Sequence, residues 1–298
     1  MKNLPYINIL KGLAIFCVVY GHLIPRSSLL AKCIYSFHMP LFFVISGFLF
    51  NFEEYQHNIS RFFKHKTVRL LFPYFVSIFL FFLYWLIFQC PKPFINTPAQ
   101  SVFDMLLDYA LHALYGSGIA NTLPSLSWAG HVGQLWFLVA LFCTNCMFLF
   151  SLKWLHNKPF WGSCLFFGSL SALGFWVGKY IFLPWSFDIS LAAMIFVFFG
   201  FCIKKYNLLE KMDLFKYKWL AILLLLGVWF MGVHYSDLSM NDRFYRNPAL
   251  AYVTAIIMSF VLFFICFKIQ NVNLMKLPLL TQGVSFYPNR YPVRPKSS

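Results

Sequence analysis

Apolar residues run in unbroken blocks of about twenty along most of this sequence, and these blocks restrict its fold more than any other feature. A helical block of that length matches the thickness of the hydrocarbon core of a bilayer. Because a helix satisfies its own backbone hydrogen bonds in lipid, the blocks predict membrane-spanning helices rather than strands. Only 11% of the residues are charged, against about a quarter in soluble domains, so a soluble globular fold is excluded.

Eight blocks have the length and composition of spans, which predicts an all-α, polytopic transmembrane bundle. We expect the spans at residues 7–25, 37–51, 70–89, 134–152, 160–178, 187–203, 219–234 and 250–268. One membrane domain is expected over residues 1–270, followed by a polar tail over residues 271–298. The last residues of that tail are rich in Pro and basic groups and lack periodicity, so we expect it to be disordered.

The basic residues, which give the chain a net charge of +15, are distributed unevenly between the two sides of these spans. If the first span enters from the cytoplasm, only six Lys and Arg residues fall outside: Arg26, Lys32, Lys92, Lys179, Arg243 and Arg246. The others fall inside, apart from Lys11 within the first span, and this bias obeys the positive-inside rule. We therefore expect a cytoplasmic N-terminus, some attraction to anionic membrane lipid, and no binding to nucleic acid.

Ionisable side chains inside the spans are the first candidates for function, because a Lys at a helix centre costs about 2.5–3.5 kcal/mol. Lys11 and His22 of the first span are eleven residues apart, which is three helical turns plus about 20°, so they share one face. They are separated by about 16 Å along the helix axis. Each also has an ordinary explanation, since Lys11 can extend to the inner headgroups and His22 can meet water at the outer helix end.

Further candidates lie where the second and third spans begin. His38 is expected at the outer boundary, close in depth to His22, and histidine suits general base catalysis because it titrates near neutral pH. A hydrogen bond to the backbone at a helix start would equally account for His38. Lys66 and Arg69 lie with His65 at the inner end of the third span. Anchoring by positive charge explains most of this cluster, although a guanidinium such as that of Arg69 also binds phosphate well.

No metal site is expected. Cys143 and Cys146 form a CxxC pair within a span, with no second pair or nearby His to complete a zinc site. Asp104, Asp108 and His112 line one face of a helix predicted to lie at the membrane interface in the outward loop. A solvated polar face is the commoner meaning of such a stripe.

Four strings resemble, in this order, motifs of the acyltransferase-3 family: INILKGLAIFCVVYGH, FHMPLFFVISGFLF, VRLLFPYF and LWFLVALF. The FHMP form resembles the branch that contains fucose O-acetylases and related sugar O-acetyltransferases. The resemblance covers residues 5–90 closely and 134–205 loosely. It implies a multi-pass enzyme of the bacterial inner membrane that moves acetyl or other acyl groups from acyl-coenzyme A onto extracytoplasmic glycans.

Carried over by position, His22 matches the essential histidine of the family, and His38 and Arg69 match positions common in this branch. Lys11 stands where many members have Arg, which keeps the charge and loses the bidentate fork. The family typically has about ten spans, whereas eight are expected here, and the chain changes character abruptly after Gln282. This difference predicts a frameshift or a truncation near that position.

We therefore expect an O-acetyltransferase with acetyl-coenzyme A as donor and a sugar hydroxyl of a surface polysaccharide, lipopolysaccharide or related glycan as acceptor. His22 and His38 are the expected catalytic residues, and Lys11, Arg69 and Lys66 are the expected donor-binding residues. Two alternatives stay open. One is a transporter or flippase for a lipid-linked sugar or small anion, and the other is an inactive, truncated family member. The sequence does not define the oligomeric state.

Overall fold

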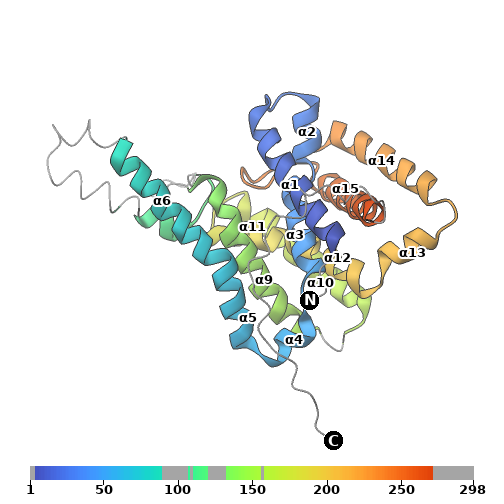
Figure 1. Ribbon diagram of the computed structural model, residues 1–298, viewed down its shortest axis with the longest axis horizontal. Helices are drawn as coiled ribbons and strands as arrows, with labels where there is room; N and C mark the ends of the chain where they lie inside the picture. The colour runs from blue at the N-terminus through green and yellow to red at the C-terminus, as the bar shows by residue number, and fades with distance from the viewer. Residues whose placement is uncertain (1–3, 89–106, 108–109, 120–131, 156–157, 271–298) are drawn as a thin grey trace, which may run out of the picture.

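The computed structural model describes residues 4–88, 107, 110–119, 132–155 and 158–270 (Figure 1). Within these residues the chain is almost entirely helical, apart from one antiparallel hairpin between α14 and α15. The described elements are α1 (Pro5–Leu23), α2 (Leu29–Tyr35), α3 (His38–Phe48), α4 (Phe52–His57), α5 (Ile59–Lys66), the π-helix η1 (Thr67–Leu71), α6 (Phe72–Phe88), the 3-10 turn η3 (Gly133–Leu135), α9 (Trp136–Trp154), α10 (Phe160–Gly178), the 3-10 turn η4 (Pro184–Ser186), α11 (Phe187–Ala192), α12 (Met194–Lys205), α13 (Leu208–Leu214), α14 (Lys218–Tyr235), β1 (Asp237–Ser239), β2 (Phe244–Arg246) and α15 (Pro248–Ile269).

The predicted all-α, polytopic membrane architecture is confirmed. Seven helical stretches among the described residues are long and apolar enough to cross a membrane, and a bent pair of helices makes an eighth. The seven are Pro5–Leu23, Leu29–Phe48, Ile59–Tyr84, Gly133–Trp154, Phe160–Gly178, Lys218–Tyr235 and Pro248–Ile269. The bent pair joins Pro184–Ala192 to Met194–Lys205 at an angle of 55°. The predicted tail and most of the predicted interfacial helix, including Asp104 and Asp108, lie outside the described residues.

Two spans begin earlier than the apolar blocks predict, because polar residues cap helices that the hydropathy pattern misses. The Ser28 side chain accepts a hydrogen bond from the Ala31 amide at 3.1 Å and starts α2, so His38 lies within the second span. The Asn58 side chain accepts from the Arg61 amide at 2.9 Å and starts α5, which continues through η1 into α6. Lys66 and Arg69 therefore lie inside a continuous helical stretch rather than before it.

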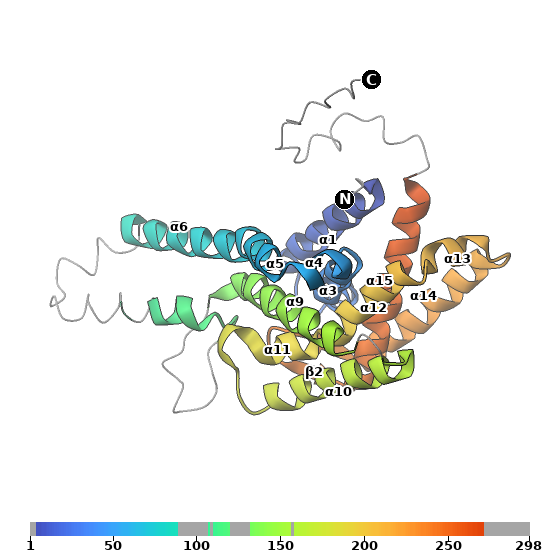
Figure 2. The ribbon, with the colours of Figure 1, turned by 90° about the horizontal axis from the view of Figure 1, so that it is seen from below.

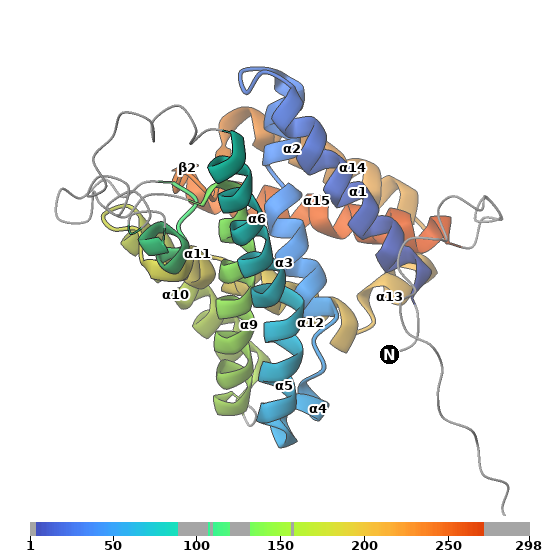
Figure 3. The same cartoon turned by 60° about the vertical axis from the view of Figure 1, so that its left-hand side comes forward.

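The centre of the bundle depends on a close contact between α3 and α12. A Cβ atom at Gly47 would lie 1.9 Å from the Val197 carbonyl oxygen, and one at Gly200 would lie 1.9 Å from the Val44 carbonyl oxygen. Only glycine lets the two backbones touch in this way, as in other close helix pairs of membrane proteins. Against this pair, α15 packs on α1 and α3 and crosses both (Figure 3).

Helix α6 is poorly covered by the rest of the protein, whereas the hairpin packs closely on the bundle. Figure 2 shows α6 projecting from the other helices, which agrees with the many exposed apolar side chains along it. Exposed apolar surface of this kind suits contact with lipid. The hairpin, by contrast, packs on α2 and α15, with Leu238 paired to Tyr245 across the two strands. It covers one end of the bundle, beside the C-terminal end of α1.

Candidate active site

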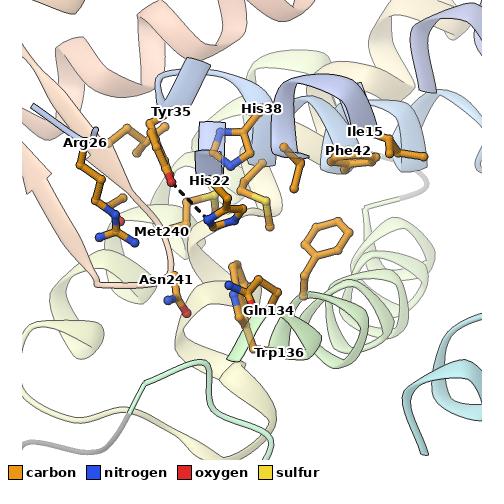
Figure 4. A pocket seen from close by; sticks show the side chains of 15 residues that line it. Ile15, His22, Arg26, Tyr35, His38, Phe42, Gln134, Trp136, Met240 and Asn241 are labelled. Carbon is orange, nitrogen blue, oxygen red and sulfur yellow. Dashed lines mark hydrogen bonds between the residues drawn. The ribbon is translucent and has the colours of Figure 1, made fainter. Parts of the chain in front are cut away.

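A cavity of about 310 Å³ opens between the C-terminal end of α1, the junction of α2 and α3, the start of α9 and the turn of the hairpin (Figure 4). Both predicted catalytic histidines, His22 and His38, line it. Tyr35 lines it as well, and its ring makes edge contacts with the rings of His22 and His38 at centroid distances of 6.2 and 4.9 Å. The fold therefore gathers two imidazoles and one phenol around a single cavity.

His38 is buried and held in one orientation. Its Nδ1 lies 2.9 Å from the carbonyl oxygen of Ile34. Because a carbonyl can only accept, Nδ1 carries the proton in neutral His38 and Nε2 keeps a lone pair. The sequence left open whether His38 serves catalysis or bonds the backbone at a helix start. The backbone bond is present, and it leaves the second ring nitrogen able to accept a hydrogen bond.

His22 is exposed to the cavity and lies beside the Tyr35 hydroxyl. Its Nδ1 is 3.5 Å from that oxygen, the dashed contact in Figure 4, and the same hydroxyl lies 3.4 Å from the Gly21 carbonyl, to which it can donate. Gly21 lets α1 pack closely on α2 here, because a Cβ there would lie 3.1 Å from the Ile34 side chain. If Tyr35 donates to Gly21, the Nδ1–H of His22 can donate to Tyr35. The Nε2 of His22 is then free to act as a base.

The three predicted donor-binding residues also come together, about three helical turns away along α1. Arg69 in η1 is close enough to both Lys11 and Lys66 for mutual electrostatic repulsion. The Lys66 ammonium donates to the Asn145 side-chain oxygen at 2.7 Å, which also accepts from the Ser46 hydroxyl at 3.0 Å. Among the described residues, none of the three cations forms an ion pair with an acid. We call Lys11, Lys66 and Arg69 the basic cluster.

One face of α1 joins the basic cluster to the histidine cavity. Ile15 and Val18, which line the cavity with His22, follow Lys11 at intervals of four and seven residues. Such intervals place side chains on the same side of a helix. The face thus carries a cation at one end, an apolar stretch in the middle and an imidazole at the other end.

A buried ion pair that the sequence did not predict holds the wall of the cavity. Arg243 is the last residue of the hairpin turn, and its Nε and Nη2 lie 2.9 and 3.4 Å from the carboxylate oxygens of Asp188 in α11. The two side chains are 3% and 0% exposed, so the charges are removed from solvent. The guanidinium also lies over the Phe182 ring at 4.2 Å and donates to the Asn241 carbonyl at 2.7 Å.

Other contributors escaped prediction for a similar reason. Asn145 sits in a stretch whose pattern predicts only apolar helix, and Tyr35 falls in the loop expected between the first two spans. Their partners lie in other helices. Arg243 was expected only as a basic residue on the outer side, and Asp188 was given no role, although two opposite charges in a chain with so few are a usable signal. Pairing across 55 residues depends on the tertiary fold and leaves no local periodicity.

The fold and the polar groups within it define a multi-pass helical membrane protein with an ionisable site built between its spans. A family model described as an acyltransferase domain matches residues 4–280. The chain therefore belongs to the acyltransferase-3 family, as its motifs predicted. A comparison with curated proteins and one with solved structures each found no match.

Proposed function

We propose that this protein is a membrane-embedded O-acyltransferase of the bacterial inner membrane. It moves an acetyl group from acetyl-coenzyme A to a sugar hydroxyl of a surface polysaccharide, lipopolysaccharide or related glycan. The observation that supports this most directly is the continuous face of α1, which runs from Lys11 to His22 past Ile15 and Val18. A donor with anionic phosphates, an extended arm and a reactive thioester fits that order of groups.

The basic cluster would bind the phosphates of the donor. Its three cations lack acidic partners among the described residues, so an anionic ligand would relieve their mutual repulsion. Arg69 supplies a planar guanidinium suited to phosphate, whereas Lys11 supplies a point charge. With the N-terminus in the cytoplasm, as the positive-inside rule predicts, the cluster faces the compartment that contains acyl-coenzyme A.

The histidine cavity would carry out the transfer. The acceptor oxygen attacks the acyl carbon, a C–O bond forms, and the C–S bond of the thioester breaks. The hydroxyl proton moves to the Nε2 of His22 and then to the departing coenzyme A thiolate. His38, held with Nδ1 donating to Ile34, would accept a hydrogen bond through Nε2 from a neighbouring hydroxyl of the acceptor and orient it. Tyr35 keeps the His22 ring in place.

The test of this function is acetyl transfer by purified protein in proteoliposomes, with labelled acetyl-coenzyme A and surface glycan from the source cells. Removing a general base typically lowers the rate by about 10²–10⁴-fold, and we expect that loss for His22→Ala. A His22→Ala protein that transfers acetyl at the wild-type rate would contradict the assignment. The O-acetyl content of surface glycans with and without the gene provides the matching test in cells.

Donor binding separates the enzyme from the transporter alternative. Calorimetric titration with coenzyme A should show binding that Lys11→Ala and Arg69→Ala weaken. Lys64→Ala is the matched control, because Lys64 is an exposed cation of α5 outside the basic cluster. Absence of coenzyme A binding to the wild-type protein would favour a transporter or an inactive family member.

A further inference from the structure

A second hollow adjoins the histidine cavity on its hairpin side. It has a volume of about 290 Å³ and lies between α2 and the two strands of the hairpin. Four of its lining residues, Arg26, Tyr35, Leu238 and Ser239, also line the histidine cavity. The two hollows therefore lie next to each other and share part of their walls. We call the second one the hairpin hollow.

The hairpin hollow offers hydrogen-bond donors and acceptors at close spacing. The Asp242 carboxylate accepts from the Ser239 hydroxyl at 2.6 Å and from the Arg26 guanidinium at 3.1 Å. Lys32 and Asp237 line the same hollow. A sugar hydroxyl both donates and accepts, so it needs a surface where the two kinds of group lie side by side.

An aromatic surface completes this lining. Phe244 lines the hollow and is 57% exposed, so its ring is open to a ligand there. The apolar C–H face of a pyranose ring can cover such a side chain while its hydroxyls reach the charged groups around it. Tyr35 forms the boundary with the histidine cavity, with the Arg26 guanidinium 5.6 Å from its ring centre.

The charge of the lining points to a neutral ligand. Two cations, Arg26 and Lys32, are balanced by two anions, Asp237 and Asp242. Arg246 lies outside the lining, with its guanidinium 4.0 Å from Asp237. A uronic acid or sugar phosphate in this hollow would be repelled by the carboxylates of Asp237 and Asp242. The basic cluster differs, because its three cations have no acidic partner among the described residues and suit a phosphate.

The hollow is also held in shape from behind. Arg243 lies between Asp242 and Phe244 in the chain, and its buried pair with Asp188 fixes the backbone that carries both. A wall fixed in this way loses little conformational entropy when a ligand binds. The sequence places Asp242 and Phe244 in a loop and gives no sign of this arrangement.

We propose that the hairpin hollow binds a neutral sugar unit of the acceptor, next to the unit whose hydroxyl reaches the histidines. Asp242 and Arg26 bind its hydroxyls, and Phe244 stacks on its ring. This inference rests on the proposed function for the role of the histidine cavity. The binding itself needs no donor, so it can be measured separately.

The experiment measures sugar binding to the purified full-length protein by saturation-transfer NMR, without acyl-coenzyme A. The probes are neutral tetrasaccharides of glucose, galactose, mannose or fucose, with tetragalacturonate as the acidic comparison. We expect at least one neutral probe to bind in the millimolar range, and tetragalacturonate to bind at least about tenfold more weakly. Asp242→Asn and Phe244→Ala should each weaken the neutral probe by about tenfold.

Two control variants test whether the effect is local. Tyr180→Ala removes an exposed aromatic beyond α10, and Glu210→Gln neutralises an exposed acid of α13. Both should bind the neutral probe within about twofold of wild type. Retention of the wild-type melting temperature and elution volume by Asp242→Asn or Phe244→Ala shows that the variant is folded.

The inference is overturned if no neutral probe binds, if tetragalacturonate binds best, or if both hairpin variants bind like wild type. Acetyl transfer is measured in parallel on the same preparations. Sugar binding that depends on Asp242 and Phe244, without any acetyl transfer, would retain the subsite and reject the proposed function. Acetyl transfer with an acceptor KM that is unchanged in both variants would retain the proposed function and reject the sugar subsite.

Discussion

The buried pair of Asp188 and Arg243 makes a sharp prediction about stability. Its side chains are 0% and 3% exposed, so Asp188→Ala leaves the Arg243 guanidinium enclosed without its carboxylate. Loss of one partner of a buried pair typically costs about 3–5 kcal/mol, because the remaining charge stays desolvated. We expect a loss of that size for Asp188→Ala, with a similar loss for Arg243→Met, which leaves the carboxylate, among the described residues, with the Leu183 amide at 3.2 Å as its remaining donor.

The double variant Asp188→Ala, Arg243→Met distinguishes this reasoning from a simple packing effect. It removes both charges, so it should be more stable than the sum of the single losses predicts, by several kcal/mol. The assay is reversible denaturation of the protein in mild detergent, followed by intrinsic tryptophan fluorescence. Exposed ion pairs contribute about 0–1 kcal/mol, and a loss in that range for both single variants would refute the argument. Additive losses in the double variant would refute it as well.

Three further predictions follow from other contacts. Gly47→Ala places a methyl group 1.9 Å from the Val197 carbonyl oxygen, so we expect α3 and α12 to separate and the purified yield of folded protein to fall steeply. Gly168→Ala is the control, because a Cβ there meets nothing within 4 Å, and it should leave the yield unchanged. Lys11→Arg should lower the KM for acyl-coenzyme A because the guanidinium adds a bidentate contact, and a raised KM would argue against phosphate binding at this position. Hydrogen bonds from Lys218 and Lys268 lower the pKa of Asp213 in the folded protein. The stabilisation by Asp213 is therefore fully present above its unfolded-state pKa of about 4, and it is lost as the pH falls through the lower folded-state value. Asp213→Asn should reduce the acid-induced fall in melting temperature, and an unchanged pH profile of the melting temperature would exclude this role.

Local features of the sequence predicted the spans and one face of the first helix. Hydropathy depends on consecutive residues, so eight apolar blocks sufficed for the membrane architecture. The helical repeat likewise placed Lys11 and His22 on one side of α1. In the third span only the start was placed too late, because α5 is amphipathic and basic and begins at the Asn58 cap rather than at an apolar block.

Features that depend on contacts between distant segments could not be predicted in this way. Tyr35 between the two histidines, Asn145 beneath Lys66 and the pairing of Asp188 with Arg243 each need the folded bundle to bring them together. Periodicity within one helix gives no information about its neighbours. The cavity wall formed by the hairpin was missed for the same reason, because its short strands lie in what the sequence presents as a connecting loop.

The glycine contact between α3 and α12 sets an order for the assembly of this protein during synthesis. Gly47 and Gly200 are 153 residues apart, so the helix that carries His38 and Ser46 enters the membrane long before its partner exists. At a ribosome rate of about 5–20 residues per second, this interval is roughly 8–30 s. Throughout it, α12 cannot cover the face around Gly47, so lipid, the insertion machinery or an earlier helix must do so. The nascent chain therefore holds this surface without its final partner for the whole interval.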